Sequence, residues 1–284
     1  MNWKAYLRLS RFDKPAGIAL LWSPTAWALW IANQGFPPLK LIILFFLGTL
    51  FMRAAGCVVN DIADRQIDLH VQRTKHRPLA TGEISLIGAL LLLMFFLFSA
   101  LLILLQLPSV CFYYSLVALG VTILYPFCKR FIQCPQLVLG IAFSMGIPMA
   151  FAASHVAPNA SMGILLAINF AWILAYDTQY AMADRADDLR ISVQSTAIFF
   201  AAYDRIVIAC LQIFFHGLWL VLAFKLNFSK YFYIGWGLAA LVLIYQQSLL
   251  VVRQEEKYLQ AFSSNSWYGL VMWVLGVSMV PIYH

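Results

Sequence analysis

Residues 39–68 read LKLIILFFLGTLFMRAAGCVVNDIADRQID, in which a long apolar run ends at a cluster of acidic side chains. The run has about the 20 residues that a helix needs to cross a lipid bilayer. Across all 284 residues, 63% are hydrophobic and only 11% are charged. These proportions differ strongly from those of a soluble domain and predict an all-α integral membrane protein.

Eight further apolar stretches have a similar length. With the first run, at 40–59, they cover 15–33, 85–106, 109–127, 134–154, 159–176, 196–223, 230–251 and 266–283. We therefore expect nine transmembrane helices. They would form one domain over residues 1–284, with two repeat-like halves of about 1–130 and 131–284.

The basic residues predict the orientation of these helices. With a cytoplasmic N-terminus, nearly all arginines and lysines fall on the inner side, and only Lys40, Lys225 and Lys230 fall outside. This is the positive-inside pattern of multi-pass membrane proteins. The formal charge of +7 is thereby explained by topology, so no nucleic-acid partner is expected.

The acidic cluster occurs twice, since DRQID at 64–68 is followed by DRADD at 184–188. Carboxylates four residues apart share one face of a helix, where they repel each other unless a cation joins them. Oxygen-only ligands suit Mg²⁺, which shares its remaining positions with phosphate oxygens. The two motifs therefore predict Mg²⁺ and a phosphorylated substrate at the aspartates Asp64, Asp68, Asp184 and Asp188.

Cationic side chains near the acids are suited to a diphosphate. Arg73 and Arg77 repeat the spacing of four residues, and a third inner loop carries Tyr125, Lys129 and Arg130. Charge-assisted hydrogen bonds from such groups stabilise phosphate oxygens. Basic residues at inner helix ends are also topological signals, so each of them alone has a second interpretation.

Arg53 is the cation that topology explains least, because it lies inside the apolar run, about 10 Å deeper than Asn60 by helical rise. We expect it to face an anionic group in a cavity. Asp61 and Asp177 are intermediate between structural and functional interpretations. The five histidines and five cysteines lack ligand spacing, and the cysteines are expected to be buried free thiols.

The motifs together resemble a known family. The pattern N-D-x-x-D-x-x-x-D at 60–68, R-x-x-x-R-P at 73–78, Y-x-x-x-K at 125–129 and D-x-x-x-D at 184–188 resemble the membrane aromatic prenyltransferases of the UbiA superfamily. The resemblance spans nearly the whole chain. Within the superfamily, RAAGCVVND at 53–61 and YDTQYAM at 176–182 are similar to the 4-hydroxybenzoate polyprenyltransferases of ubiquinone biosynthesis.

The resemblance implies a central cavity below both aspartate motifs, with Mg²⁺ joining them to a polyprenyl diphosphate. By position, the implied metal ligands are Asn60, Asp64, Asp68, Asp184 and Asp188. The implied diphosphate-binding residues are Arg73, Arg77, Lys129 and Arg130. Arg53 and Tyr125 would lie near the aromatic acid or the reacting carbon, and would complete the catalytic set with the four aspartates.

The implied reaction moves a polyprenyl group to the ring carbon ortho to the hydroxyl of 4-hydroxybenzoate and releases diphosphate. The implied place is the bacterial inner membrane, among its lipids, with the site toward the cytoplasm. Other acceptors (dihydroxynaphthoate, homogentisate, haem), a secondary transporter, the prenyl length and the proton-accepting base stay open. Gln194 stands where related enzymes often carry lysine, so a phosphate contact from that position is not expected.

Overall fold

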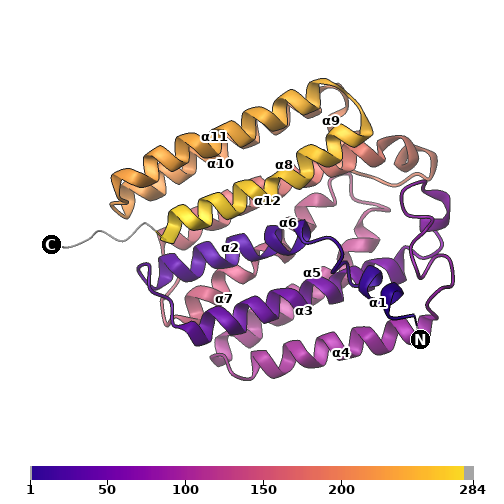
Figure 1. The fold of residues 1–284 in the computed structure, drawn as a ribbon, viewed down its shortest axis with the longest axis horizontal. Helices are drawn as coiled ribbons and strands as arrows, with labels where there is room; N and C mark the ends of the chain where they lie inside the picture. Colours follow the sequence, from indigo (N-terminus) through magenta and orange to yellow (C-terminus); the bar gives the residue numbers. More distant parts are fainter. Residues whose placement is uncertain (1, 278–284) are drawn as a thin grey trace.

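The computed structural model describes residues 2–277, which are mostly helical and contain no β-strand (Figure 1). The elements are α1 (Trp3–Leu9), α2 (Ala16–Ala32), α3 (Leu39–Ala63), η1 (Asp68–His70), α4 (Leu86–Leu104), α5 (Ser109–Cys128), α6 (Gln136–Ser144), α7 (Gly146–Ala153), α8 (Ala160–Arg190), α9 (Thr196–Phe200), η2 (Ala201–Tyr203), α10 (Asp204–Lys225), α11 (Lys230–Val251) and α12 (Glu255–Val277). The predicted fold class, all-α, is confirmed.

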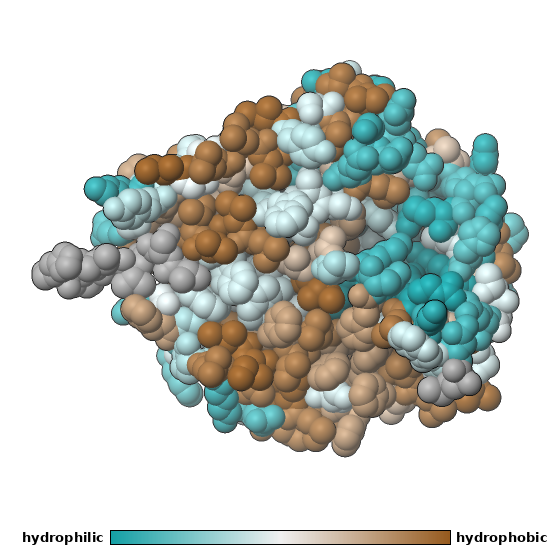
Figure 2. All heavy atoms as spheres, viewed as in Figure 1, coloured by the Kyte–Doolittle hydropathy of each residue, from teal (hydrophilic) through white to brown (hydrophobic). Residues whose placement is uncertain are grey.

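The helices have the lengths and surfaces of a multi-pass membrane protein. Seven helical segments in the described range are long and apolar enough to cross a bilayer. Helix α2 is apolar but has only 17 residues, and the described part of α12 is more polar, with Gln260, Ser264 and Asn265. On the face drawn in Figure 2, apolar side chains are frequent in the middle, while hydrophilic ones gather mainly at one end. The expected number of nine transmembrane helices stays a prediction.

Two predicted spans are not continuous helices. The stretch 134–154 forms α6 and α7, which meet at Met145. The stretch 196–223 contains α9, η2 and α10, and Ala201, the first residue of η2, has a positive φ of 49°. Hydropathy reports burial in lipid but is insensitive to a local change of backbone direction, so both interruptions were missed.

Two other helices extend past the predicted spans. The prediction placed a span at 159–176, but α8 continues to Arg190 and carries the second motif inside the helix. The last span was expected at 266–283, whereas α12 begins at Glu255 and residues 278–283 lie outside the described range. Hydropathy marks only the lipid-buried part of a helix, while its backbone hydrogen bonds continue into polar sequence.

The two acidic motifs differ in local structure. Asp184 and Asp188 share a face of α8, as predicted. The expectation that Asp64 and Asp68 share a helix face is wrong, because α3 ends at Ala63 and Asp68 begins η1. The backbone N–H of Asp68 still donates to the carbonyl of Asp64 at 2.8 Å, so a single turn joins them.

Tryptophan side chains tie α2, α8 and α10 together in the core. The ring of Trp27 lies 5.1 Å from the ring of Trp172 and 5.1 Å from that of Trp219, and all three are buried. Edge and tilted contacts at this separation are the favoured aromatic geometries. The three helices are thus fixed against one another, and α8 holds the second motif in place.

The cysteines carry no disulfide. All five are free, and Cys57, Cys111 and Cys128 are buried as expected. Cys134 is only partly buried and Cys210 is exposed, so the expectation of burial is wrong for these two. Cys210 lies on the apolar outer face of α10, where an exposed thiol can contact lipid.

Amide side chains link α8 to α10, α11 and α12 inside the bundle. Asn265 donates to Gln179 at 2.8 Å and accepts from the Trp172 indole at 3.0 Å. Gln246 accepts from Gln179 at 3.2 Å and from Gln212 at 2.7 Å. Interhelical hydrogen bonds of this kind hold transmembrane helices in register.

We expect Asn265→Leu to lower the thermal midpoint. The variant loses two interhelical bonds worth about 0.6 kcal/mol each, and the shift is about 2–4 °C. The buried Trp172 indole would also lose its acceptor. The matched control is Ser266→Ala, since the Ser266 hydroxyl bonds the carbonyl of Ser263 within α12. Equal midpoints for the two variants in a detergent unfolding assay would contradict the role of the network.

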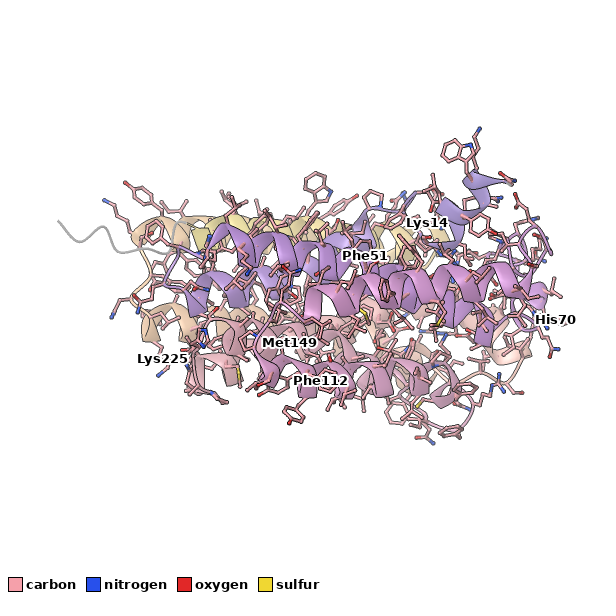
Figure 3. All side chains as sticks on the ribbon, turned by 90° about the horizontal axis from the view of Figure 1, so that it is seen from below. Lys14, Phe51, His70, Phe112, Met149 and Lys225 are labelled. Atoms are coloured by element: carbon pink, nitrogen blue, oxygen red, sulfur yellow. The ribbon has the colours of Figure 1, made fainter. Side chains whose placement is uncertain are left out.

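Both motifs lie at the same end of the bundle. The C-terminal ends of α3 and α8 point to the end that also carries α1 and the long loop after α3 (Figure 1). His70 and Lys14 lie toward this end, whereas Lys225 lies at the other (Figure 3). The fold therefore brings together residues that are more than a hundred positions apart in the sequence.

Candidate active site

A small polar chamber of about 190 Å³ lies between the ends of α3, α5 and α8. It is lined by every predicted site residue except Arg53, namely Asn60, Asp64, Asp68, Arg73, Arg77, Tyr125, Lys129, Arg130, Asp184 and Asp188. The structure thus brings the two motifs and the third loop to one chamber, and their role as one active site stays a prediction.

Arg73 crosses from the first loop to the second motif. Its Nε donates to Asp184 at 2.8 Å, and its Nη2 pairs with the other carboxylate oxygen. The guanidinium also stacks over the Tyr180 ring at 4.5 Å. Burial opposes the charge of Arg73, but Tyr180 and Asp184 raise its pKa above the ordinary value, so it stays protonated.

Arg77 lies in a row of alternating charges. Its Nη1 contacts Asp68 at 2.8 Å and Asp61 at 3.1 Å. Asp61, which is 1% exposed, also accepts from Arg11 at 2.8 Å. Burial raises the pKa of the Asp68 carboxyl, while Arg77 opposes this shift. The row joins the segment before α2 to the first motif.

Lys129 reaches the first motif from the end of α5. Its Nζ lies 3.3 Å from a carboxylate oxygen of Asp64 and 3.4 Å from the amide oxygen of Asn60. It also lies 5.3 Å from the centre of the Tyr125 ring. The backbone N–H of Gln194 donates to the Lys129 carbonyl at 2.8 Å, so the segment after α8 fixes the lysine loop.

The chamber has the donor chemistry of a Mg²⁺ site. Its acceptors are carboxylate and amide oxygens, and Mg²⁺ favours one or two carboxylates per ion with phosphate oxygens completing its shell. In the described range, no three acids, histidines or cysteines lie close enough to enclose an ion by themselves. Asp64, Asp68 and Asp184 are each paired with a basic side chain, so binding an ion requires these ion pairs to open.

A much larger cavity of about 1060 Å³ adjoins the chamber. Apolar side chains of α3, α4, α5 and α7 form most of its wall, and the polar residues lie toward the chamber. Tyr125, Asp177 and Tyr180 line both spaces, so they stand at the passage between them. A molecule with an anionic head and a long apolar chain fits this pair of spaces.

Arg53 lies in the wall of the larger cavity and not in the small chamber. It contacts Cys57 Sγ, and in the described range it has no carboxylate within 4 Å. Its guanidinium lies against α2, where a Cβ on Gly17 would come within 2.5 Å of Nη2. Glycine therefore makes room for a half-buried arginine in the cavity wall, where its guanidinium would be stabilised by an anion.

Three side chains at the site were given no role by the sequence interpretation. Arg11 and Lys14 were assigned to topology, yet Arg11 binds Asp61 and Lys14 lines the larger cavity. Burial lowers the pKa of the Lys14 ammonium, and the nearby Arg11 and Arg73 lower it further. Tyr180 had no assigned role although it stacks on Arg73. Its position four residues before Asp184 on one helix face was the available signal.

A charged chamber that opens into an apolar cavity inside a helical bundle defines a class: membrane proteins that bind an amphiphile by its anionic head. The chain belongs to the UbiA prenyltransferase family, whose model matches residues 21–275. Activity is thereby assigned at the level of prenyl transfer.

Curated relatives match over nearly the full length. A 4-hydroxybenzoate octaprenyltransferase from Legionella pneumophila (strain Philadelphia 1) is 56% identical over 279 residues, which is 98% of this chain and 99% of that protein. One from Yersinia pseudotuberculosis serotype IB is 44% identical, covering 96% of this chain and 95% of that protein.

Solved structures share the fold. The apo structure of a UbiA homologue from Aeropyrum pernix K1 has a TM-score of 0.75 at 21% identity, with 91% and 96% of the two chains covered. A UbiA homologue from Archaeoglobus fulgidus bound to GPP and Mg²⁺ has a TM-score of 0.69 at 19% identity, with 94% and 99% covered.

Proposed function

We propose that the protein transfers a polyprenyl group from polyprenyl diphosphate to the ring carbon ortho to the hydroxyl of 4-hydroxybenzoate, releasing diphosphate. The observation that carries this is the junction of the two spaces: both aspartate motifs line a chamber that opens into a large apolar cavity containing Arg53. The names of the relatives, at 56% and 44% identity, support this acceptor over dihydroxynaphthoate, homogentisate or haem.

The diphosphate would lie in the chamber. Arg73, Arg77 and Lys129 would turn from their carboxylates to the phosphate oxygens, with Arg130 at the rim. Asn60 and the aspartates Asp64, Asp68, Asp184 and Asp188 would hold Mg²⁺. When bound, Mg²⁺ neutralises charge that develops on the departing diphosphate.

The acceptor would lie deeper, beside the passage. Arg53 would bind its carboxylate, and Tyr125 would stand next to the carbon that leaves the diphosphate. Water is excluded by the apolar wall, which protects an allylic cation until the ring attacks it. The aromatic faces of Tyr125 and Tyr180 stabilise positive charge by cation–π attraction.

The site is proposed to face the cytoplasm, with the chain in the bacterial inner membrane. The charged end of the bundle carries Lys14, the first loop and the end of α8, as the positive-inside pattern requires. The transporter alternative is weaker, because the polar chamber lies at one end and not at the midplane. The two-halves division of about 1–130 and 131–284 is also part of this proposal.

The test supplies purified protein with polyprenyl diphosphate and Mg²⁺, and with 4-hydroxybenzoate or dihydroxynaphthoate as acceptor. We expect prenylated hydroxybenzoate as the product. Prenylation of the naphthoate alone would reject the acceptor, and substrate movement without transfer would favour a transporter.

Removal of the metal ion should stop the reaction. We expect EDTA to abolish transfer and added Mg²⁺ to restore it, because the basic side chains alone cannot neutralise the diphosphate and the four aspartates together. Binding of a radiolabelled prenyl diphosphate, measured as the label retained by the EDTA-treated protein, should weaken in parallel. Full transfer in EDTA would contradict the metal assignment.

A further inference from the structure

Among the described residues, Asp177 is the one acid at the junction of the chamber and the larger cavity. It lies two helical turns before Asp184 on the same face of α8, about 10 Å along the axis. It lines both the chamber and the larger cavity. In the described range it has no ion-pair partner within 4 Å, whereas Asp64, Asp68 and Asp184 are each paired with a cation.

A neutral amide, that of Gln136, lines the chamber together with Asp177. The Gln136 side-chain oxygen accepts from the backbone N–H of Thr196 at 3.0 Å, so its NH₂ group is left to donate. Gln136 and Asp177 both line the chamber, so this NH₂ group can donate to the Asp177 carboxylate. Such a donor leaves a carboxylate oxygen available and adds no positive charge beside it.

Tyr176, the residue before Asp177, indicates that a polar ligand binds in this part of the larger cavity. The Tyr176 hydroxyl is buried, lines the larger cavity and has no hydrogen-bond partner among the described residues. A prenyl chain offers no hydrogen bond, whereas an aromatic ring with a hydroxyl and a carboxylate offers several. Tyr176, Asp177 and Arg53 thus surround a space suited to the ring of the acceptor.

We propose that Asp177 is the base that removes the ring proton of the acceptor; this rests on the proposed function. Once the ring carbon has bonded to the prenyl carbon and the C–O bond to diphosphate has broken, that ring carbon carries both a hydrogen and the prenyl group. Its C–H bond breaks, the electron pair restores the aromatic ring, and the proton passes to an Asp177 carboxylate oxygen. The proton then leaves through the chamber to diphosphate or water.

Asp177→Asn is the decisive variant, because it keeps the shape and removes the basic oxygen. We expect kcat to fall by about 100-fold or more, the contribution of a positioned acid–base group. Both KM values should change by no more than about threefold, since neither substrate loses a binding charge. With the acceptor deuterated beside its hydroxyl, the variant should show a larger primary isotope effect than the wild type, because proton removal has become slower.

Two matched variants complete the experiment. Asp177→Glu retains a carboxylate and should recover part of kcat, while Glu255→Gln removes an exposed carboxylate outside both spaces and should behave as wild type. Binding of a non-reactive prenyl thiodiphosphate with Mg²⁺ should be unchanged in Asp177→Asn.

Three results would overturn the role of Asp177: an undiminished kcat in Asp177→Asn, an unchanged isotope effect despite a lower kcat, or lost binding of the thiodiphosphate. In each case wild-type transfer shows that the proposed function stands. Absence of transfer by the wild type would overturn the proposed function itself, and the role of Asp177 with it.

Discussion

Asp64→Asn and Asp184→Asn should each reduce kcat/KM for the prenyl diphosphate by about 100- to 1000-fold, the range found when a preorganised electrostatic group is removed. Asp64 at the end of α3 and Asp184 on α8 line one chamber, and each is expected to ligate Mg²⁺. Loss of either carboxylate should weaken Mg²⁺ binding, so the charge on the departing diphosphate would be incompletely neutralised. The measurement is steady-state transfer with saturating 4-hydroxybenzoate.

The comparison between the two variants is informative. If both motifs act on one diphosphate, the double variant should lose little beyond either single variant, because groups that act as a unit are not additive. Higher Mg²⁺ should partly rescue the single variants but leave Glu255→Gln unaffected. Undiminished transfer by either single variant would reject a metal site shared by both motifs.

Arg53→Met should impair use of the aromatic acid far more than use of the diphosphate. Loss of a buried charge partner costs about 2–5 kcal/mol, which is about 30-fold or more in kcat/KM for 4-hydroxybenzoate. Methionine keeps an unbranched apolar stem beside Gly17, so the change is mainly the loss of charge.

A neutral acceptor isolates this effect. With 4-hydroxybenzamide, which has no carboxylate, wild type and Arg53→Met should differ by much less than they do with 4-hydroxybenzoate. Arg205→Met is the control, because Arg205 is exposed and lines neither space. A rise confined to the KM of the diphosphate would assign Arg53 to the leaving group.

The membrane class and the composition of the chamber could be predicted from the sequence because each depends on local patterns. Apolar runs of spanning length and the repeated acids at 64–68 and 184–188 are visible without a fold. The basic residues Arg73 and Lys129 followed from charge complementarity with those acids. In the structure both line the chamber.

Contacts between distant segments could not be predicted in this way. Arg11 and Asp61 are 50 residues apart in sequence, and only the packing of the segment before α2 against the end of α3 joins them. The same holds for Gln136 and Thr196, which are 60 residues apart and whose hydrogen bond fixes the Gln136 side chain in the wall of the chamber. Single charges at helix ends resemble topological signals until their partners are known.

The most direct test of the two-motif site is a structure with Mn²⁺ in place of Mg²⁺ and a non-reactive prenyl thiodiphosphate. We predict anomalous density both beside Asp64 and Asp68 and beside Asp184 and Asp188, with Arg73 turned from Asp184 to a phosphate oxygen. Density at one motif alone, with the Arg73–Asp184 ion pair intact, would contradict the account.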